Sequence, residues 1–308
     1  LLGVAVAAMQ LGRFAAAEVH TPDRRGRAIS YVVLGGALGS VLGPLLIGPA
    51  GRAAQQAGLH ELVGPFLAAL ALLALASLVI SLWLRPDPRD IGRRIATRCR
   101  EAAVHEGPAR SVSQILRTPA AFVAVMAMVF SQIVMAMLMG MVSLHMANHQ
   151  HALAGISVVV SAHTFGMYAF SVISGRLTDR LGRGPVILAG SATLVLACAI
   201  APLSSEIVPL AVSLFLLGLG WNLCYVAGSA LLSDQLSPAE RARTQGANDF
   251  LLGLATALAF FGSGLIYAGT GYVALGIVGA IASLAPMVLT GWWMIRAQGS
   301  VAVRGSSI

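Results

Sequence analysis

Gln132 lies within a long apolar stretch and shares one helical face with Met135 and Met139, because residues three, four and seven apart lie on the same side of an α-helix. An amide that faced lipid would lack hydrogen-bond partners, and methionine side chains adapt to ligands of varied shape. These residue types predict a permissive apolar cavity that binds a ligand, rather than a catalytic centre. The alternative is that the methionines pack in a core or face lipid.

Two further apolar stretches carry polar groups at helical spacing. Thr164 and Tyr168 belong to a stripe of hydroxyl side chains, and Trp221, Asn222 and Tyr225 lie together in the other stretch. Tryptophan and tyrosine combine a large apolar ring with a hydrogen-bonding group, so these residues can stack on a ligand and hold its polar atoms. Buried packing between helices would account for the same residues without a ligand.

Ionisable residues within apolar stretches are costly and therefore indicate function. Arg13 could bind an anionic substrate, or extend its charge to the membrane surface. His163 is a candidate proton carrier because its reference pKa is about 6.5, and a hydrogen bond to a neighbouring helix is its simpler role. His145, His149 and His151 cluster without a nearby carboxylate or cysteine, so we expect no metal site there. No cofactor is expected.

The elements that carry these residues are long apolar segments. Hydrophobic residues make up 57% of the 308 positions and charged residues 10%, whereas a soluble domain has roughly 25% charged residues. A helix needs about 20 apolar residues to cross a bilayer, and lipid excludes unpaired backbone groups. We therefore predict an all-α polytopic membrane protein. The predicted spans are 1–19, 29–50, 63–84, 119–143, 152–173, 185–203, 207–230, 247–268 and 272–294.

Arginine is distributed unevenly between the segments that join these spans. If the loop 20–28 is cytoplasmic, nearly all of the 20 basic residues lie on the cytoplasmic side, as the positive-inside rule requires. The one-sided distribution of these basic residues therefore orients the protein in the inner cell membrane. The net charge of +8 that they produce does not indicate nucleic-acid binding. The long polar segment 85–118 is predicted to be a cytoplasmic linker, and the C-terminus is predicted to be cytoplasmic.

A short pattern occurs twice in the chain. Segments 18–27 and 234–243 both read acid-x-x-[Ser/Thr]-Pro-x-x-Arg-x-Arg, and six predicted spans separate the two copies. A six-span repeat with one orientation is typical of transporters built from two parallel halves. We therefore expect residues 1–84 to hold three helices of an N-terminal half, preceded by three more. Residues 119–308 would form a six-helix C-terminal half with a short tail.

The segment Gly175–Arg183 reads GRLTDRLGR. It resembles the G-x-x-x-D-[RK]-x-G-[RK]-[RK] loop signature of the major facilitator superfamily, with glycine in the last basic position. Its glycines would permit a tight turn between two helices. The resemblance implies that Asp179 caps a neighbouring helix near Ala28, that Arg180 or Arg183 pairs with Asp234, and that the loop braces the two halves. The gating residues implied are Gly175, Asp179, Arg180, Gly182, Arg183 and Asp234.

The second predicted span contains Gly35, Gly39, Gly43 and Pro44. Glycines four apart form a smooth stripe for close helix contact, against which we expect Gly166 to pack, and proline permits a bend. The pattern resembles the Gly-x-x-x-Gly-Pro element in the fifth helix of proton-coupled efflux members, although serine replaces a further glycine of that element. The resemblance implies efflux rather than uptake, and helix packing alone is the alternative explanation.

The resemblance covers the whole chain, whose spans match helices four to twelve of the family. It implies a secondary active transporter that moves a small organic solute by alternating access, with proton-coupled efflux as the expected mode. The alternatives are a proton-coupled uptake symporter and a non-transporting sensor or truncated membrane protein. A membrane enzyme would need clustered catalytic groups, so we expect no enzyme. The expected partners are the substrate, protons and lipid, and the protein is expected to be a monomer.

Overall fold

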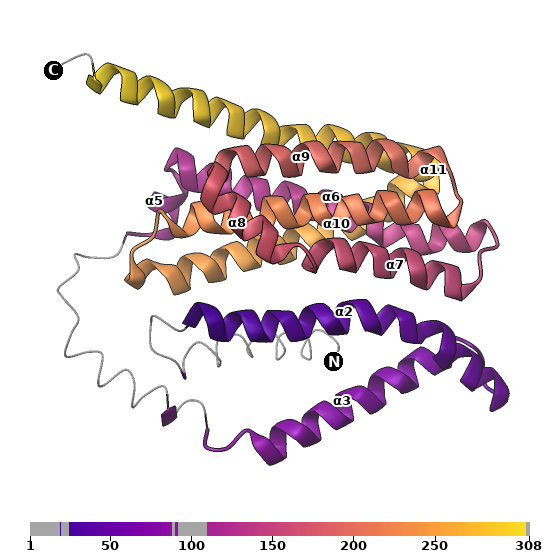
Figure 1. The fold of residues 1–308 in the computed structure, drawn as a ribbon. Helices are drawn as coiled ribbons and strands as arrows, with labels where there is room; N and C mark the ends of the chain where they lie inside the picture. Colours follow the sequence, from indigo (N-terminus) through magenta and orange to yellow (C-terminus); the bar gives the residue numbers. More distant parts are fainter. Residues whose placement is uncertain (1–18, 20–24, 88–89, 92–109, 306–308) are drawn as a thin grey trace. The chain divides into compact units, whose positions relative to one another are not determined.

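The computed structural model describes residues 19, 25–87, 90–91 and 110–305 (Figure 1). The chain divides into two compact units, Leu1–Gly107 and Pro108–Ile308. All regular elements in these described ranges are helical, and six helical segments are long and apolar enough to cross a membrane. The prediction of an all-α polytopic membrane protein is confirmed. Apart from residue 19, the predicted span 1–19 lies outside the described residues.

The first unit contains α2 (Arg25–Gln56) and α3 (Val63–Trp83), which coincide with the second and third predicted spans. The two helices meet closely at Gly64, where an added Cβ atom would lie within 3 Å of the backbone of Ala50. Side chains along α3 are largely exposed within this unit, with Phe66 77% and Trp83 82% exposed. The first unit does not cover the apolar side chains of α3. Such a helix is stable where lipid or other membrane helices cover these side chains instead.

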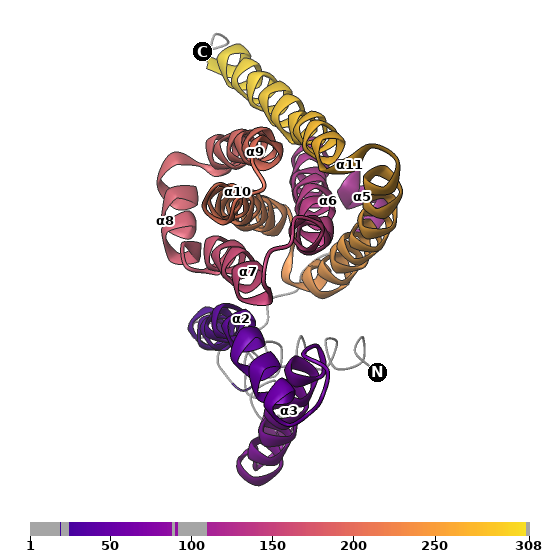
Figure 2. The ribbon, with the colours of Figure 1, turned by 90° about the vertical axis from the view of Figure 1, so that its right-hand side faces the viewer.

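The second unit is a bundle of helices seen end-on in Figure 2. In this bundle α6 packs against α10 and α11, α10 packs against α7 and α9, and α9 packs against α11. The elements are α5 (Val112–Leu116), α6 (Pro119–Asn148), α7 (Leu153–Tyr168), α8 (Ser171–Leu181), α9 (Arg183–Ile200), a 3₁₀ turn (Ala201–Leu203), α10 (Ile207–Ser233) and α11 (Pro238–Gly305). The short α5 begins with a capping box, in which Ser111 and Gln114 satisfy each other's backbone N–H groups.

The long element α11 contains two membrane crossings. Its apolar part, Arg243–Arg296, has 54 residues and would be about 80 Å long as one straight helix, whereas the hydrocarbon core is about 30 Å thick. Gly271 interrupts the helix with φ +77°, a conformation that glycine adopts without steric cost. Leu252 and Leu289 pack in the same apolar cluster, so the chain runs across and returns. The spans predicted at 247–268 and 272–294 correspond to these two arms.

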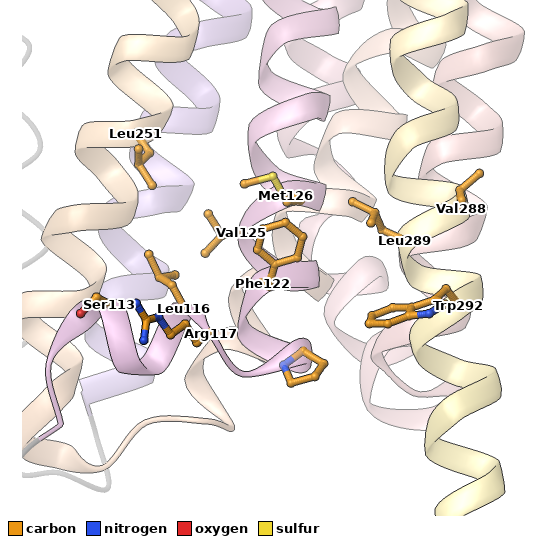
Figure 3. A pocket seen from close by; sticks show the side chains of 11 residues that line it. Ser113, Leu116, Arg117, Phe122, Val125, Met126, Leu251, Val288, Leu289 and Trp292 are labelled. Atoms are coloured by element: carbon orange, nitrogen blue, oxygen red, sulfur yellow. The ribbon is translucent and has the colours of Figure 1, made fainter.

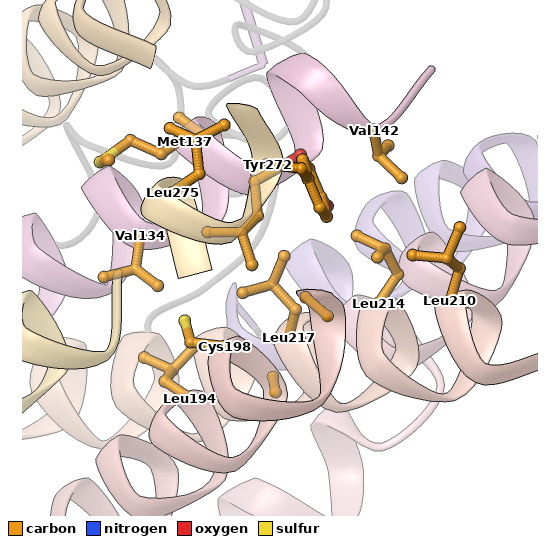
Figure 4. Packing of buried hydrophobic residues seen from close by; sticks show 14 of the residues in the cluster. Val134, Met137, Val142, Leu194, Cys198, Leu210, Leu214, Leu217, Tyr272 and Leu275 are labelled. Carbon is orange, nitrogen blue, oxygen red and sulfur yellow. The ribbon is translucent and has the colours of Figure 1, made fainter. Parts of the chain in front are cut away.

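The core of the second unit lies where α6, α9, α10 and α11 meet. Figure 4 shows part of it, with Leu194 and Cys198 of α9 beside Leu217 of α10 and Leu275 of α11. Cys198 and Cys224 are buried free thiols within this cluster. Aliphatic side chains interdigitate there on the inner sides of the helices, which fixes the register of the polar groups that α6 and α10 present elsewhere.

The buried carboxylate of Glu240, in the first turn of α11, connects this helix to the start of the second unit. The Glu240 side chain is 3% exposed and accepts hydrogen bonds from Nε of Arg110 at 2.9 Å and from the Arg110 backbone N–H at 2.8 Å. The backbone N–H of Ser237 donates to the same carboxylate at 3.0 Å, and Arg243 donates to the carbonyl oxygen of Arg110. The Arg110 guanidinium holds the pKa of Glu240 well below its usual range.

Replacing Glu240 by glutamine should lower the midpoint of thermal unfolding at neutral pH, because the amide loses the charge that binds Arg110. A carboxyl group whose pKa is lower in the folded state contributes fully above its unfolded value of about 4.3, and this contribution is lost as the pH falls below that value. The difference between E240Q and the unmodified protein should therefore shrink in acid. Glu206→Gln is the matched control, because Glu206 is exposed. If the difference in unfolding midpoint between E240Q and the unmodified protein were the same at every pH, the loss of stability would not come from the charge of Glu240.

Candidate functional site

The side chain of Gln132 on α6 joins α10 to α11. Its Oε1 accepts a hydrogen bond from Nε1 of Trp221 at 2.8 Å, and its Nε2 donates to Oγ1 of Thr256 at 2.9 Å. Thr256 donates in turn to the carbonyl oxygen of Leu252 at 2.8 Å. A glutamine amide has two N–H donors and two acceptor lone pairs, so these bonds leave one donor and one acceptor for another group. Gln132 is half-buried, which gives such a group access.

Aromatic rings surround this amide. The rings of Trp221 and Tyr225 are stacked, with centroids 4.8 Å apart and planes inclined by 16°. Tyr168 of α7 meets Trp221 edge-on at 6.4 Å. Trp221 is 8% exposed, whereas both tyrosines are half-buried. The indole therefore orients its neighbours, and the two tyrosines present the accessible ring surface.

Four of the residues predicted to line a cavity thus lie together: Gln132, Tyr168, Trp221 and Tyr225. Met135 and Met139 are half-buried on α6 beyond Gln132. Thr164 is half-buried one turn before Tyr168 and donates to the carbonyl oxygen of Ser161 at 3.0 Å. Two other methionines of α6, Met128 and Met146, are fully buried in the core. Arg13 lies outside the described residues.

Asn222 faces a break between α7 and α8 and is 2% exposed. The helix is interrupted at residues 169–170. There, Nδ2 of Asn222 donates to the carbonyl oxygen of Met167 at 2.6 Å and to Oγ of Ser171 at 2.9 Å. Oγ of Ser174 donates to Oδ1 of Asn222 at 2.5 Å. The amide therefore satisfies polar groups that the interruption would otherwise leave unpaired inside the membrane. The predicted span 152–173 corresponds to the candidate membrane span Leu153–Leu181, and the short interruption inside it is a feature that the sequence did not predict.

Replacing Asn222 by leucine, which has a similar size, should destabilise the protein by about 1–3 kcal/mol, because the carbonyl of Met167 and the hydroxyl of Ser174 would lose their partner. The measurement is the thermal unfolding midpoint of the purified protein in detergent. Asn148→Leu removes an exposed amide that donates to the hydroxyl group of Tyr267 and should change the midpoint little. Equal effects of the two substitutions would contradict the bracing role of Asn222.

His163 lies at a close crossing of α7 and α10. Its Nδ1 is 2.9 Å from the carbonyl oxygen of Leu214, and the side chain is 1% exposed. The simpler role that the sequence suggested, a hydrogen bond to a neighbouring helix, is present. Its Nε2 is buried and has no hydrogen-bond partner among the described residues. Gly166 and Gly218 line the same crossing, where a Cβ atom added to either would lie within 3 Å of the opposing backbone. The expectation that Gly166 packs on the second span is therefore wrong: it packs on α10.

The segment Gly175–Arg183 is largely helical and not a loop. Gly175 lies within α8, and an added Cβ atom there would meet nothing within 4 Å in the described structure. Gly182 alone makes the turn, with φ +90°, so the prediction that both glycines form it is wrong. Nε of Arg183 donates to Oδ2 of Asp234 at 2.9 Å. Of the two arginines expected to pair with Asp234, Arg183 is therefore the one that does so. Nη1 of Arg183 also lies 3.6 Å from Oδ1 of Asp179. Arg180 is exposed at the end of α8.

The remaining predicted residues lie at other places in the fold. On α2, an added Cβ atom at Gly35, Gly39 or Gly43 would meet nothing within 4 Å in the described residues, and Pro44 follows them inside the helix. Their packing role, like the contact of Asp179 near Ala28, stays a prediction. His145 lies beyond the end of the predicted span 119–143 but within the last turn of α6.

His145 stacks there on Tyr272, with centroids 4.4 Å apart. Among the described residues, no group of three histidine, cysteine, aspartate or glutamate side chains could hold a metal ion.

Sequence reasoning missed Thr256, Ser174 and the Arg110–Glu240 pair. Thr256 is one of three hydroxyl groups in the predicted span 247–268, and a polar residue at such a position needs a partner, so a search for hydroxyl groups within apolar spans would have included it. Ser174 and the Arg110–Glu240 pair carry no comparable signal, because their partners lie 48 and 130 residues away.

Known proteins resemble the chain over most of its length. Residues 124–304 match the family described as the Major Facilitator Superfamily. The MFS-type transporter YdeG of Bacillus subtilis (strain 168) is 35% identical over 294 residues, which covers 95% of this chain and 68% of YdeG. The riboflavin transporter RfnT of Brucella anthropi is 30% identical, over 84% of this chain and 62% of RfnT. The multidrug resistance protein MdtL of Shigella flexneri is 34% identical over 29% of this chain and 23% of MdtL. The chain therefore belongs to the major facilitator superfamily of membrane transporters.

Proposed function

We propose that the protein is a secondary active transporter that moves a small organic compound across the inner cell membrane by alternating access, in proton-coupled efflux. The single observation that carries this proposal is the group formed by Gln132, Trp221 and Tyr225, together with the family to which the chain belongs. Polar side chains inside a membrane domain are retained where they meet a substrate or one another. Here the amide has unused donor and acceptor capacity beside half-buried aromatic rings.

The ligand that suits this group is a planar aromatic compound with at least one polar atom near its ring. The half-buried rings of Tyr168 and Tyr225 can stack on a flat ligand, and Gln132 can supply one donor and one acceptor to its edge. Met135 and Met139 extend the site with adaptable apolar side chains. The names of RfnT and MdtL, a riboflavin transporter and a multidrug resistance protein, support a ligand of this class.

In the same proposal the ion pair between Arg183 and Asp234 belongs to the conformational switch, with Asp179 and Arg180 facing the N-terminal half. An ion pair that is partly exposed contributes little to stability, so it can form and break as the halves move. His163 is assigned the proton, because its Nδ1 donates to the carbonyl oxygen of Leu214 and its buried Nε2, which has no hydrogen-bond partner among the described residues, keeps a lone pair that can accept a proton.

Flux into everted membrane vesicles tests the proposal. Vesicles that contain the protein should accumulate amphipathic aromatic cations or weak acids when respiration acidifies their lumen, and a protonophore should abolish the accumulation. Vesicles with the double variant Gln132→Leu/Trp221→Phe are the matched control. Flux that ran only in the opposite direction would assign the protein to uptake symport. No gradient-dependent flux of any such compound would contradict the proposal.

Riboflavin as the transported compound has one specific observation in its favour. The resemblance to RfnT covers 84% of the chain, whereas the resemblance to MdtL covers 29%. Riboflavin is therefore the first compound to be tested in right-side-out and everted vesicles side by side.

A further inference from the structure

A crevice separates α5 and α6 from the two arms of α11 (Figure 3). Its volume is about 850 Å³, within the range of about 300–1,000 Å³ for ligand pockets. Carbon-rich side chains form nearly all of its lining, and the charged group among them is Arg117. The main apolar residues of its walls are Leu116, Phe122, Met126, Leu251, Leu289 and Trp292.

The crevice opens on an apolar surface of the second unit. Val288 at its edge is 68% exposed, and Ile281 and Ile295 on the same arm of α11 are 63% and 72% exposed. Side chains of this kind on a membrane-spanning helix contact lipid, because water would make their exposure unfavourable. An occupant that enters from this surface comes from the bilayer and must present hydrocarbon to the walls.

Positive charge lies at one end of the crevice. Arg117 lines it, and Arg296 places its guanidinium 4.5 Å from the ring of Trp292. Within the described residues, neither arginine forms an ion pair with a carboxylate. In Figure 3, Arg117 and Trp292 lie toward the same end of the crevice, while Leu251 and Val288 lie toward the other end.

We propose that this crevice binds an anionic glycerophospholipid, with an acyl chain against the walls and the phosphate at Arg117 and Arg296. The wall on α6 runs from Pro119 to Met126, about 10 Å of helix, which accommodates the upper part of an acyl chain. Juxtamembrane arginines attract anionic headgroups. The bound lipid contacts both α5 and the two arms of α11, so it holds α5 against the rest of the second unit.

The test is native mass spectrometry of the purified, delipidated protein titrated with dioleoyl phosphatidylglycerol or dioleoyl phosphatidylcholine. The acyl chains are identical, so the comparison isolates the headgroup. We expect phosphatidylglycerol to bind at least ten-fold more tightly. Arg117→Gln and Arg296→Gln should each weaken its binding about five-fold, since one arginine near an anionic headgroup contributes about that factor. Val288→Trp, at an exposed position that tolerates a larger side chain, should block both lipids.

Arg176→Gln is the matched control, because Arg176 is an exposed arginine on α8 outside the crevice. It should leave phosphatidylglycerol binding unchanged. Equal binding of the two lipids, or an equal loss in Arg176→Gln, would overturn the proposal in favour of apolar filling or diffuse charge attraction. If lipid binding survived Val288→Trp, the lipid would bind elsewhere, and the proposal would be overturned. If the protein formed a dimer that excluded lipid, the crevice would be occupied by a second copy of the chain, which would also overturn the proposal.

Discussion

Replacing Trp221 by alanine should reduce the catalytic efficiency of transport about 30-fold for a compound that the protein moves. The substitution removes the ring that stacks on Tyr225 at 4.8 Å and the N–H that holds Gln132 at 2.8 Å. Truncating a buried aromatic residue at the centre of a binding site costs about 2 kcal/mol or more. The measurement is the initial rate of uptake into proteoliposomes as a function of substrate concentration.

Two control variants separate the contributions of Trp221. Trp221→Phe keeps a ring beside Tyr225 but cannot donate to Gln132. Its transport efficiency should therefore lie between that of the unmodified protein and that of the alanine variant. Trp83→Phe changes a tryptophan that is 82% exposed on α3 and should leave the rate unchanged. Normal transport by Trp221→Ala in a correctly folded protein would remove the aromatic group from the proposed binding site.

Replacing Gly218 by leucine should prevent stable folding of the second unit. A Cβ atom at this position would lie within 3 Å of the carbonyl oxygen of His163 and of the backbone N–H of Met167. Backbone atoms cannot move aside as a flexible side chain can, so α7 and α10 must separate. Overpacking of a close contact costs about 1–3 kcal/mol, and the separation also breaks the bond between His163 and Leu214. We expect a loss of monodisperse protein after solubilisation, with a lower unfolding midpoint for any that remains.

Gly253→Leu provides the matched control for this substitution. Gly253 is an exposed glycine within α11, and an added Cβ atom there would meet nothing within 4 Å in the described structure. The same change should be tolerated and should slightly favour the helix, since glycine is about 1 kcal/mol less favourable than alanine within helices. Similar yields of the two variants would show that the α7–α10 crossing is wider than the structure has it.

The helical spans could be predicted because the length of an apolar segment is set by the thickness of the bilayer. The ends of α3, of α9 and of the apolar part of α11, Arg243–Arg296, lie within a few residues of the prediction. The turns at Gly182 and Gly271 were also accessible to sequence reasoning, because positive φ values strongly favour glycine. The ion pair of Arg183 with Asp234 was one of the two pairings that the resemblance of the loop signature implied.

The break between α7 and α8 could not be predicted, since Ala169 and Phe170 are apolar and neither is a helix breaker. It depends on an amide from another helix, and Asn222 is 48 residues from Ser174 in the sequence. The faces of single helices were predictable at Gln132, Trp221 and Tyr225, whereas their mutual contacts were not. Periodicity places a residue on one side of its own helix, and only tertiary packing determines which neighbour it meets.

Paired distance measurements between spin labels test alternating access most directly. One pair, Leu84→Cys with Leu181→Cys, labels one helix end in each unit on the side that the arginine distribution predicts to be cytoplasmic. A second pair, Leu59→Cys with Ala154→Cys, labels helix ends predicted to lie on the opposite side. Cys198 and Cys224 are buried, so replacing Cys99 by serine gives a suitable background. On acidification, and on addition of a transported compound, one distance should lengthen while the other shortens. Distances that stayed fixed, or that changed in the same direction, would contradict alternating access of the two halves.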